Sequence, residues 1–312
     1  MDYLMLIGGL VILIFSGDLL VKGAVNLALQ LKIPPLIIGL TVVSIGTSAP
    51  ELFASLKAVG LGAADISVGN VVGSNIANLA LVLGLTTIIF PVVVRRTLLW
   101  NEWIVLTLVS TLFVVFSLDG KLSTWDGIAF LVLLVSYLVF LVFSARSKKK
   151  KKVELEVDEE IPSEPKPWHW IVVFLIAGFV GLYFGAEWLI SGAVEIAKSF
   201  DVSEYTIGVT VVAFGTSVPE LATSAIAAFK QESDISIGNL IGSNVFNVLG
   251  VLGVTSVVQN LNIPDTVLSN DFFWMMGIVL VLFPMIYFTN KISRFSGLLL
   301  FGAYIFYVFL LF

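Results

Sequence analysis

The sequence contains no cysteine, so it can form no disulfide bond, thiol nucleophile or cysteine-ligated metal centre. It contains one histidine, His169, which excludes a metal site built from several histidines. We find no phosphate-binding loop, no nucleophile–base pair and no cofactor motif. The sequence therefore predicts a protein that is not an enzyme and has no cofactor, and nothing in it indicates a nucleic-acid partner or a required protein partner.

Charge is also scarce: 12% of the residues are charged and 58% are hydrophobic, and the mean hydropathy is +1.03. A run of about 20 apolar residues can span a lipid bilayer as a helix. These runs are too continuous for the alternating strands of a membrane β-barrel. We predict an all-α polytopic membrane protein with about ten transmembrane helices. The expected spans are 3–29, 36–58, 66–90, 101–118, 126–144, 168–197, 205–229, 235–258, 271–289 and 293–312.

The chain repeats itself. Residues 38–84 and 207–253 align without gaps, and each contains the pattern GTS-x-PE followed by GN-x-x-GSN. We predict two five-helix repeats, over 1–144 and 168–312. Because five is odd, the second repeat would be inverted in the membrane, as in many secondary transporters.

The basic residues predict which side each loop faces. When the loops are placed on alternating sides, one side receives most of the lysines and arginines, and the positive-inside rule makes it cytoplasmic. Both termini are then expected outside. The cytoplasmic set is Lys32, Arg95, Arg96, Arg146, Lys148 to Lys152, Lys166, Lys230, Lys291 and Arg294, and the outer set is Lys57, Lys121 and Lys198.

The two repeats are joined by a charged segment, residues 145–167, which contains three prolines and no apolar helical stripe. We interpret it as a flexible cytoplasmic linker whose lysines contact anionic lipid. A regulatory cation-binding segment around Asp158 to Glu160 is the alternative.

Each repeat places a carboxylate inside an apolar span, Glu51 in GTSAPE and Glu220 in GTSVPE. A charge near the bilayer centre is costly, so it indicates an ion or substrate pathway. Pro50 and Pro219 have no N–H, so each helix should break just before its glutamate and leave oxygen atoms facing inward. The alternative is a helix kink whose glutamate pairs with a lysine. Lys22 is the only clear candidate inside the membrane, and Asp18, four residues before it, is a favourable partner for it on the same helix. We therefore expect a pairing or gating role, and not ion ligation, for Asp18 and for its counterpart Glu187.

Further oxygen atoms accompany these carboxylates. The neighbouring residues that carry hydroxyl groups are Thr47, Ser48, Thr216 and Ser217. In the GN-x-x-GSN segment of each repeat, a serine and an asparagine four residues apart share one helical face. These pairs are Ser74 with Asn78 and Ser243 with Asn247. Four more asparagines are expected to hydrogen-bond across helices instead: Asn70, Asn75, Asn239 and Asn244.

All these donors are hard oxygen atoms, which suit Ca²⁺ better than Mg²⁺ because Mg²⁺ demands a strict octahedron. Na⁺ could occupy the same oxygens, and competition for shared ligands would make the protein a Ca²⁺/Na⁺ antiporter. Two glutamates could also carry two protons, so H⁺/Ca²⁺ antiport is the alternative, and another divalent cation could replace Ca²⁺. A cation channel is a rival class that the inverted repeat with paired broken helices disfavours. A non-transporting membrane scaffold is another, and it would require that Glu51→Gln leave every ion flux unchanged.

These motifs resemble the cation/calcium exchanger superfamily, specifically its sodium/calcium exchanger branch of prokaryotic type, over essentially the whole chain. The resemblance implies an inner-membrane antiporter working by alternating access, with ions bound at the midplane between the repeats. It implies that Glu51 and Glu220 bind Ca²⁺ and line flanking Na⁺ sites. It also implies that residues 3–29 and 168–197, which contain Asp18 and Glu187, slide as a gate. Some relatives, including potassium-dependent exchangers, carry aspartate where this chain has Asn78 or Asn247, which weakens any case for K⁺ co-transport.

Overall fold

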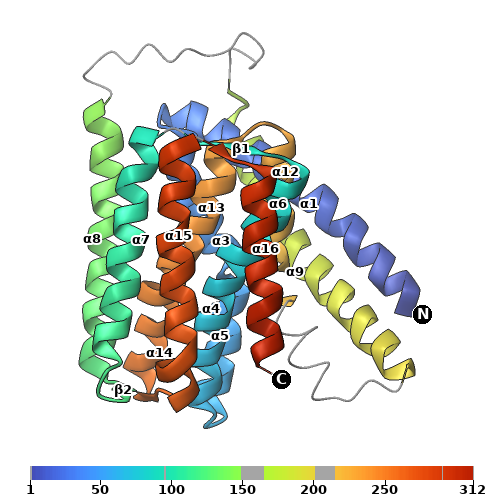
Figure 1. Ribbon diagram of the computed structural model, residues 1–312. Coiled ribbons are helices and arrows are strands. Elements are labelled where there is room, and N and C mark those ends of the chain that lie inside the picture. Colours follow the sequence, from blue (N-terminus) through green and yellow to red (C-terminus); the bar gives the residue numbers. More distant parts are fainter. Residues whose placement is uncertain (1, 95, 149–164, 201–214, 290, 312) are drawn as a thin grey trace.

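The computed structural model describes residues 2–94, 96–148, 165–200, 215–289 and 291–311. Most of the predicted linker, including Asp158 to Glu160, lies outside the described residues. The first part of the span predicted at 205–229 also lies outside them. The described chain is a helical bundle, and several helices of the first half have a counterpart in the second half (Figure 1).

Helices account for nearly all of the described structure. The first half contains α1 (Asp2–Leu31), α2 (Pro35–Ile38), η1 (Gly39–Val43), α3 (Ser44–Thr47), α4 (Ala49–Gly60), α5 (Ala64–Ile76), η2 (Ala77–Val82), α6 (Leu83–Ile89), α7 (Arg96–Phe116) and α8 (Thr124–Lys148). The second half contains α9 (Trp168–Ser199), α12 (Val218–Phe229), α13 (Ser233–Phe246), η4 (Asn247–Leu252), α14 (Gly253–Val258), η5 (Val267–Asp271), α15 (Phe272–Thr289) and α16 (Arg294–Leu310). The segments labelled η are single turns of π-helix set between α-helices.

The described residues contain 6 helices that are long and apolar enough to cross a membrane, or up to 7 if one bent pair counts as one span. Three further apolar helices are shorter, at Asn101–Phe116, Val218–Phe229 and Arg294–Leu310. Each coincides with a predicted span, but its described apolar part is shorter than the stretch that the sequence suggested. The molecule is therefore an integral membrane protein of apolar helices, and the exact count of ten stays a prediction.

Two short strand pairs tie the halves together at opposite ends of the bundle (Figure 1). Strand β1 (Val92–Val93) pairs antiparallel with β4 (Lys291–Ile292), and β2 (Lys121–Leu122) pairs antiparallel with β3 (Leu261–Asn262). Each pair therefore joins a loop of the first half to a loop of the second half. Hydropathy did not predict these strands, because each is only two residues long.

Helices α1 and α9 lie side by side, inclined to the rest of the bundle (Figure 1). Glycines allow this close approach. A Cβ atom at Gly9 of α1 would lie 2.5 Å from the backbone nitrogen of Leu189, and one at Gly178 of α9 would lie 2.9 Å from the Cα atom of Leu20. The two helices therefore form a unit in which backbone packs on backbone.

The two halves also cross closely where α13 passes over α2 and η1. A Cβ atom at Gly238 would lie 2.7 Å from the carbonyl oxygen of Leu36, and one at Gly242 would lie 2.7 Å from the carbonyl oxygen of Leu40. Side chains at these two positions would hold the helices apart. The crossing brings the GN-x-x-GSN segment of the second half against the broken helix of the first half.

One ion-pair cluster connects α1 to the remaining helices. Asp18 pairs with Lys22 on its own helix at 2.7 Å, and it also pairs with Lys230, the residue that follows α12. This is the pairing role that the sequence suggested for Asp18. Glu187, the equivalent residue in α9, is exposed, and it forms no ion pair with another described residue.

We expect Lys230→Met to lower the apparent melting temperature of the purified protein by about 2 °C, because a partly exposed ion pair contributes less than roughly 1 kcal/mol. Lys22→Met is the matched control. It removes a lysine from the same carboxylate without removing a contact between α1 and α12, so its effect should be smaller. A shift for Lys22→Met that equals or exceeds that of Lys230→Met would contradict the assignment.

Candidate ion-binding site

The first GTS-x-PE segment breaks its helix where proline predicts a break. Helix α3 ends at Thr47, and α4 begins at Ala49 with Pro50 in its first turn. The axis bends by 41° between residues 35–47 and 49–60. Because Pro50 supplies no N–H, this turn of the helix cannot continue with regular hydrogen bonds. The break places Glu51 in the first turn of α4.

The second GTS-x-PE segment repeats the arrangement. Helix α12 begins at Val218 with Pro219 in its first turn, and Glu220 follows in the same turn. Thr216 and Ser217 lie in the turn before the helix. Both glutamates therefore stand at helix N-termini, where backbone N–H groups favour negative charge.

The asparagines that were predicted as ligands lie in π-helical turns. Asn78 lies in η2, and Asn247 is the first residue of η4. Single π-turns inside α-helices are frequent at functional sites, because the extra residue re-aims the side chains of that turn. The sequence does not predict these turns, since their composition is that of an ordinary apolar helix.

The structure buries nearly all of the predicted ligands. Both glutamates are completely buried, at 0% exposure. The other buried members are Thr47, Ser48, Ser74, Asn78, Ser217, Ser243 and Asn247. Thr216 is partly buried. The two glutamate carboxylates also lie near enough to repel each other.

Hydrogen bonds between the halves bring these residues into one site. The Ser48 hydroxyl donates to Oε1 of Glu220 at 3.1 Å. The Asn247 amide donates to Oγ of Ser74 at 3.0 Å. The hydroxyl oxygens of Thr47 and Ser243 lie 3.4 Å apart. Each of these contacts joins residues that lie between 172 and 196 positions apart in the sequence.

Several buried oxygen atoms of the site have no hydrogen-bond partner among the described residues. They are both carboxylate oxygens of Glu51, Oε2 of Glu220, Oγ of Ser217, and Oδ1 of Asn78 and of Asn247. A buried polar atom without a partner is costly, so this many in one place indicates a ligand. All of them are hard oxygen donors of the type that Ca²⁺ and Na⁺ bind. The described residues hold no group of three or more acidic or histidine side chains, so two carboxylates carry the negative charge.

The four asparagines that were expected to bond across helices behave differently from one another. Asn70 donates to Oγ of Ser55 at 3.0 Å, and Asn239 donates to Oγ of Ser224 at 3.1 Å. Asn239 also accepts from Thr47, at 3.0 Å. Asn75 bonds to the second half as well, but the side chain of Asn244 has no partner in the described part of the chain.

The sequence analysis missed two carboxyl groups outside the site, of which Glu102 is buried and Asp271 is half-buried. Glu102 in α7 accepts from the hydroxyl of Tyr137 at 2.7 Å, and Asp271 in η5 accepts from the hydroxyl of Tyr307 at 3.3 Å. The repeat offset aligns the two carboxyls, and each tyrosine lies thirteen residues after the first residue of its helix. The same alignment applied beyond residue 84 would have found them.

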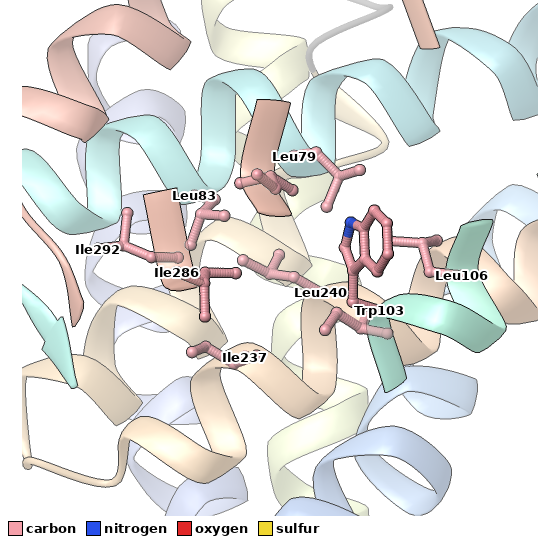
Figure 2. Close-up of a pocket in the computed structure, with 10 residues that line it drawn as sticks. Leu79, Leu83, Trp103, Leu106, Ile237, Leu240, Ile286 and Ile292 are labelled. Atoms are coloured by element: carbon pink, nitrogen blue, oxygen red, sulfur yellow. The ribbon is translucent and has the colours of Figure 1, made fainter. Parts of the chain in front are cut away.

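A small cavity has none of the proposed ion ligands in its lining. Figure 2 shows that the lining consists of aliphatic side chains and the indole of Trp103. The indole Nε1 of Trp103 donates to the carbonyl oxygen of Val279 at 2.7 Å, so it is not available to a ligand in the cavity. The lining residues are Leu79, Leu83, Trp103, Leu106, Ile237, Leu240, Ile241, Leu282, Ile286 and Ile292.

Comparison with known proteins gives consistent matches over the full length. A family model described as sodium/calcium exchanger protein matches residues 1–143 and 170–312. The inner membrane protein YrbG of Escherichia coli strain K12 is 37% identical over 305 residues, which cover 96% of this chain and 94% of that protein. The sodium/calcium exchanger MaX1 of Methanosarcina acetivorans is 29% identical over 346 residues, which cover 100% of this chain and 98% of that protein.

A solved structure has the same fold. The sodium-calcium exchanger NCX_Mj, soaked with zero Na⁺ and Ca²⁺, superposes with a TM-score of 0.85 at 33% sequence identity. The match covers 100% of this chain and 99% of that chain. The likeness therefore extends to both halves and to the elements that carry the buried oxygens.

Proposed function

Since the chain belongs to the sodium/calcium exchanger family, we propose that it exchanges Ca²⁺ for Na⁺ across the membrane at the site between its two halves. It is a transporter of the membrane, and the Na⁺ and Ca²⁺ gradients supply the free energy of exchange. The ions are its substrates and not resident cofactors.

The observation that carries this proposal is the set of unpartnered oxygen atoms around Glu51 and Glu220. Their two carboxylates neutralise one Ca²⁺, and the amide oxygens of Asn78 and Asn247 with the hydroxyl of Ser217 extend the cage toward the six to eight oxygens that Ca²⁺ takes. Thr47, Ser48, Ser74, Thr216 and Ser243 complete the proposed ligand set. Na⁺ binds the same kinds of oxygen, so the two ions compete for one site.

The strand pairs support the proposed topology of ten spans in two inverted repeats, 1–144 and 168–312. The β1–β4 pair joins two loops that the positive-inside rule assigns to the cytoplasm, and the β2–β3 pair joins two loops assigned to the outside. No strand pair joins loops assigned to opposite sides in the described part of the chain. In the proposed topology the linker, 145–167, would lie in the cytoplasm and both termini would lie outside.

Alternating access by a moving pair of helices fits the way α1 and α9 are built. Their glycine-lined interface makes them one unit, and α1 is attached to α12 through the Asp18–Lys230 pair. A unit that slides past the remaining helices could expose the site to one side and then the other. Both helices lie where the family resemblance places the gate.

Ion flux in proteoliposomes tests the proposal. Vesicles loaded with Na⁺ and diluted into Na⁺-free buffer should accumulate radioactive Ca²⁺, because outward Na⁺ movement drives Ca²⁺ inward. Vesicles with equal Na⁺ on both sides are the control and should accumulate little. A parallel set with a pH gradient and no Na⁺ should also accumulate little.

Two outcomes would count against sodium coupling or against exchange. Uptake driven only by the pH gradient would make the protein a H⁺/Ca²⁺ antiporter on the same fold. Unsaturable flux that needs no counter-ion would indicate a channel.

A further inference from the structure

The hydrogen bonds of the site are divided unequally between two halves that carry the same polar residues at equivalent positions of the site. Oε1 of Glu220 accepts from Ser48 at 3.1 Å and from Ser243 at 3.4 Å. The equivalent donors for Glu51 are Ser217 and Ser74. Neither oxygen of Glu51 accepts a hydrogen bond from another described residue, and Oγ of Ser217 has no partner among them.

The side-chain amide of Asn247 makes hydrogen bonds that its counterpart in the other half does not make. Its Nδ2 donates to Oγ of Ser74 at 3.0 Å and to Oδ1 of Asn75 at 3.2 Å, which leaves its Oδ1 free. Asn75 in turn donates to the backbone carbonyl of Asn244 at 3.4 Å. Every polar atom of the Asn75 side chain is therefore in use.

The equivalent bonds in the other half are absent. The repeat offset matches Asn247 with Asn78, and it matches Asn75 with Asn244. Asn78 and Asn244 are fully or almost fully buried. Within the described residues, neither Nδ2 nor Oδ1 of either side chain has a hydrogen-bond partner.

The chemistry of an amide ligand gives this asymmetry a meaning. A cation binds the amide oxygen, so the NH₂ group of the same amide must point away from the ion and needs its own acceptor. Asn75 and Ser74 supply the acceptors for Asn247, which leaves its oxygen free for the ion. Ser243 and Asn244 are the counterparts of Ser74 and Asn75 in the other half, but in this conformation the Nδ2 atom of Asn78 has no acceptor among the described residues. A buried NH₂ group without an acceptor is costly, so Asn78 is expected to find one in another state.

We propose that Asn75 and Asn244 are positioning residues that act in turn. In the conformation described here, Asn75 holds the amide of Asn247 with its oxygen toward the ion. In the conformation open to the opposite side of the membrane, Asn244 holds the amide of Asn78 in the same way, and Ser217 donates to Glu51. The inference rests on the proposed antiport, and it specifies how the two halves of that site exchange roles.

Because the polar residues of the site are the same at equivalent positions of the two halves, this exchange costs little free energy. One set of bonds is broken while a chemically equivalent set forms, so the two conformations can be close in energy. A transporter needs this balance, because a strong preference for one conformation would trap it there.

The test measures Ca²⁺ affinity separately on each face of the membrane. Right-side-out and inside-out membrane vesicles containing the wild type, Asn75→Ala or Asn244→Ala would be assayed for exchange of radioactive Ca²⁺ against unlabelled Ca²⁺. This self-exchange needs no coupling ion, so it works whether Na⁺ or H⁺ drives net transport. The two alanine variants are matched controls for each other, because they make the same change at equivalent positions.

We expect Asn75→Ala to raise the KM for Ca²⁺ about fivefold on one face, the change that a hydrogen bond of ordinary strength produces. Asn244→Ala should raise it by a similar factor on the opposite face. Asn75→Thr and Asn244→Thr keep a hydroxyl acceptor, so they should give smaller shifts on the same respective faces. A merely structural role would instead lower the amount of active protein without a preference for one face.

Several results would overturn the inference. These are equal shifts on both faces, shifts on the same face for both residues, or no shift at all. Loss of folded protein in all four variants would show that the amides only hold the fold together, which would also overturn it. Wild-type vesicles without Ca²⁺ exchange would refute the proposed function itself, whereas active wild type with symmetric variants would refute only this inference.

Discussion

Glu51→Gln and Glu220→Gln should each lower Na⁺-driven Ca²⁺ uptake by at least about a hundredfold, since removing one partner of a buried charge interaction costs roughly 3–5 kcal/mol. Both side chains are completely buried. Glutamine has nearly the same shape as glutamate, so the substitution removes a charge and a strong oxygen donor without opening a cavity. A divalent ion would then face a single carboxylate.

Glu102→Gln is the matched control for this prediction. Glu102 is a buried glutamate of the same bundle, and it accepts from Tyr137 outside the ion site. The amide oxygen of glutamine can accept the same hydrogen bond. Uptake by Glu102→Gln should therefore stay within about twofold of the wild type.

Initial rates of radioactive Ca²⁺ uptake in proteoliposomes containing equal amounts of protein measure all three variants. Uptake by Glu51→Gln or Glu220→Gln that stays within a few-fold of the wild type would remove that residue from the site. An equal loss in Glu102→Gln would show that any buried glutamate is needed for folding, and it would leave the charge argument without support.

Gly242→Val should weaken the packing between the two halves. Its new side chain would begin 2.7 Å from both the carbonyl oxygen of Leu40 and Oγ of Ser44. Backbone atoms cannot move aside as a flexible side chain can, so α13 would be pushed away from η1. Overpacking of this kind costs about 1–3 kcal/mol, and more where backbone is displaced.

We expect Gly242→Val to lower the apparent melting temperature by roughly 5 °C or more, and to reduce the yield of monodisperse protein. Gly277→Val is the matched control, because a Cβ atom at Gly277 of α15 meets no described atom within 4 Å. Its melting temperature should stay within about 1 °C of the wild type. A stable, active Gly242→Val variant would mean that the crossing of α13 and η1 is not as close as described.

Much of this site could be predicted from residues close together in the sequence. The break at Ser48 follows from Pro50, whose missing N–H affects its own turn of helix. Burial of Glu51 and Glu220 follows from the apolar runs around them. The pairing of these two regions follows from the repeat, because equivalent elements of a duplicated unit occupy equivalent places.

The sequence alone thus determined the membrane class, the two candidate carboxylates, the oxygen chemistry of the ligands and the points at which the helices break. The tertiary structure decided which side chains meet. It placed Asn239 against Thr47, and it left the side chains of Asn78 and Asn244 and the Oδ1 atom of Asn247 without a hydrogen-bond partner among the described residues. The physical reason is range. Helix breaks and burial depend on residues within a few turns, whereas these hydrogen bonds join residues 172 and 192 positions apart. Two equivalent sequences can divide such bonds unequally only through the conformation of the whole molecule.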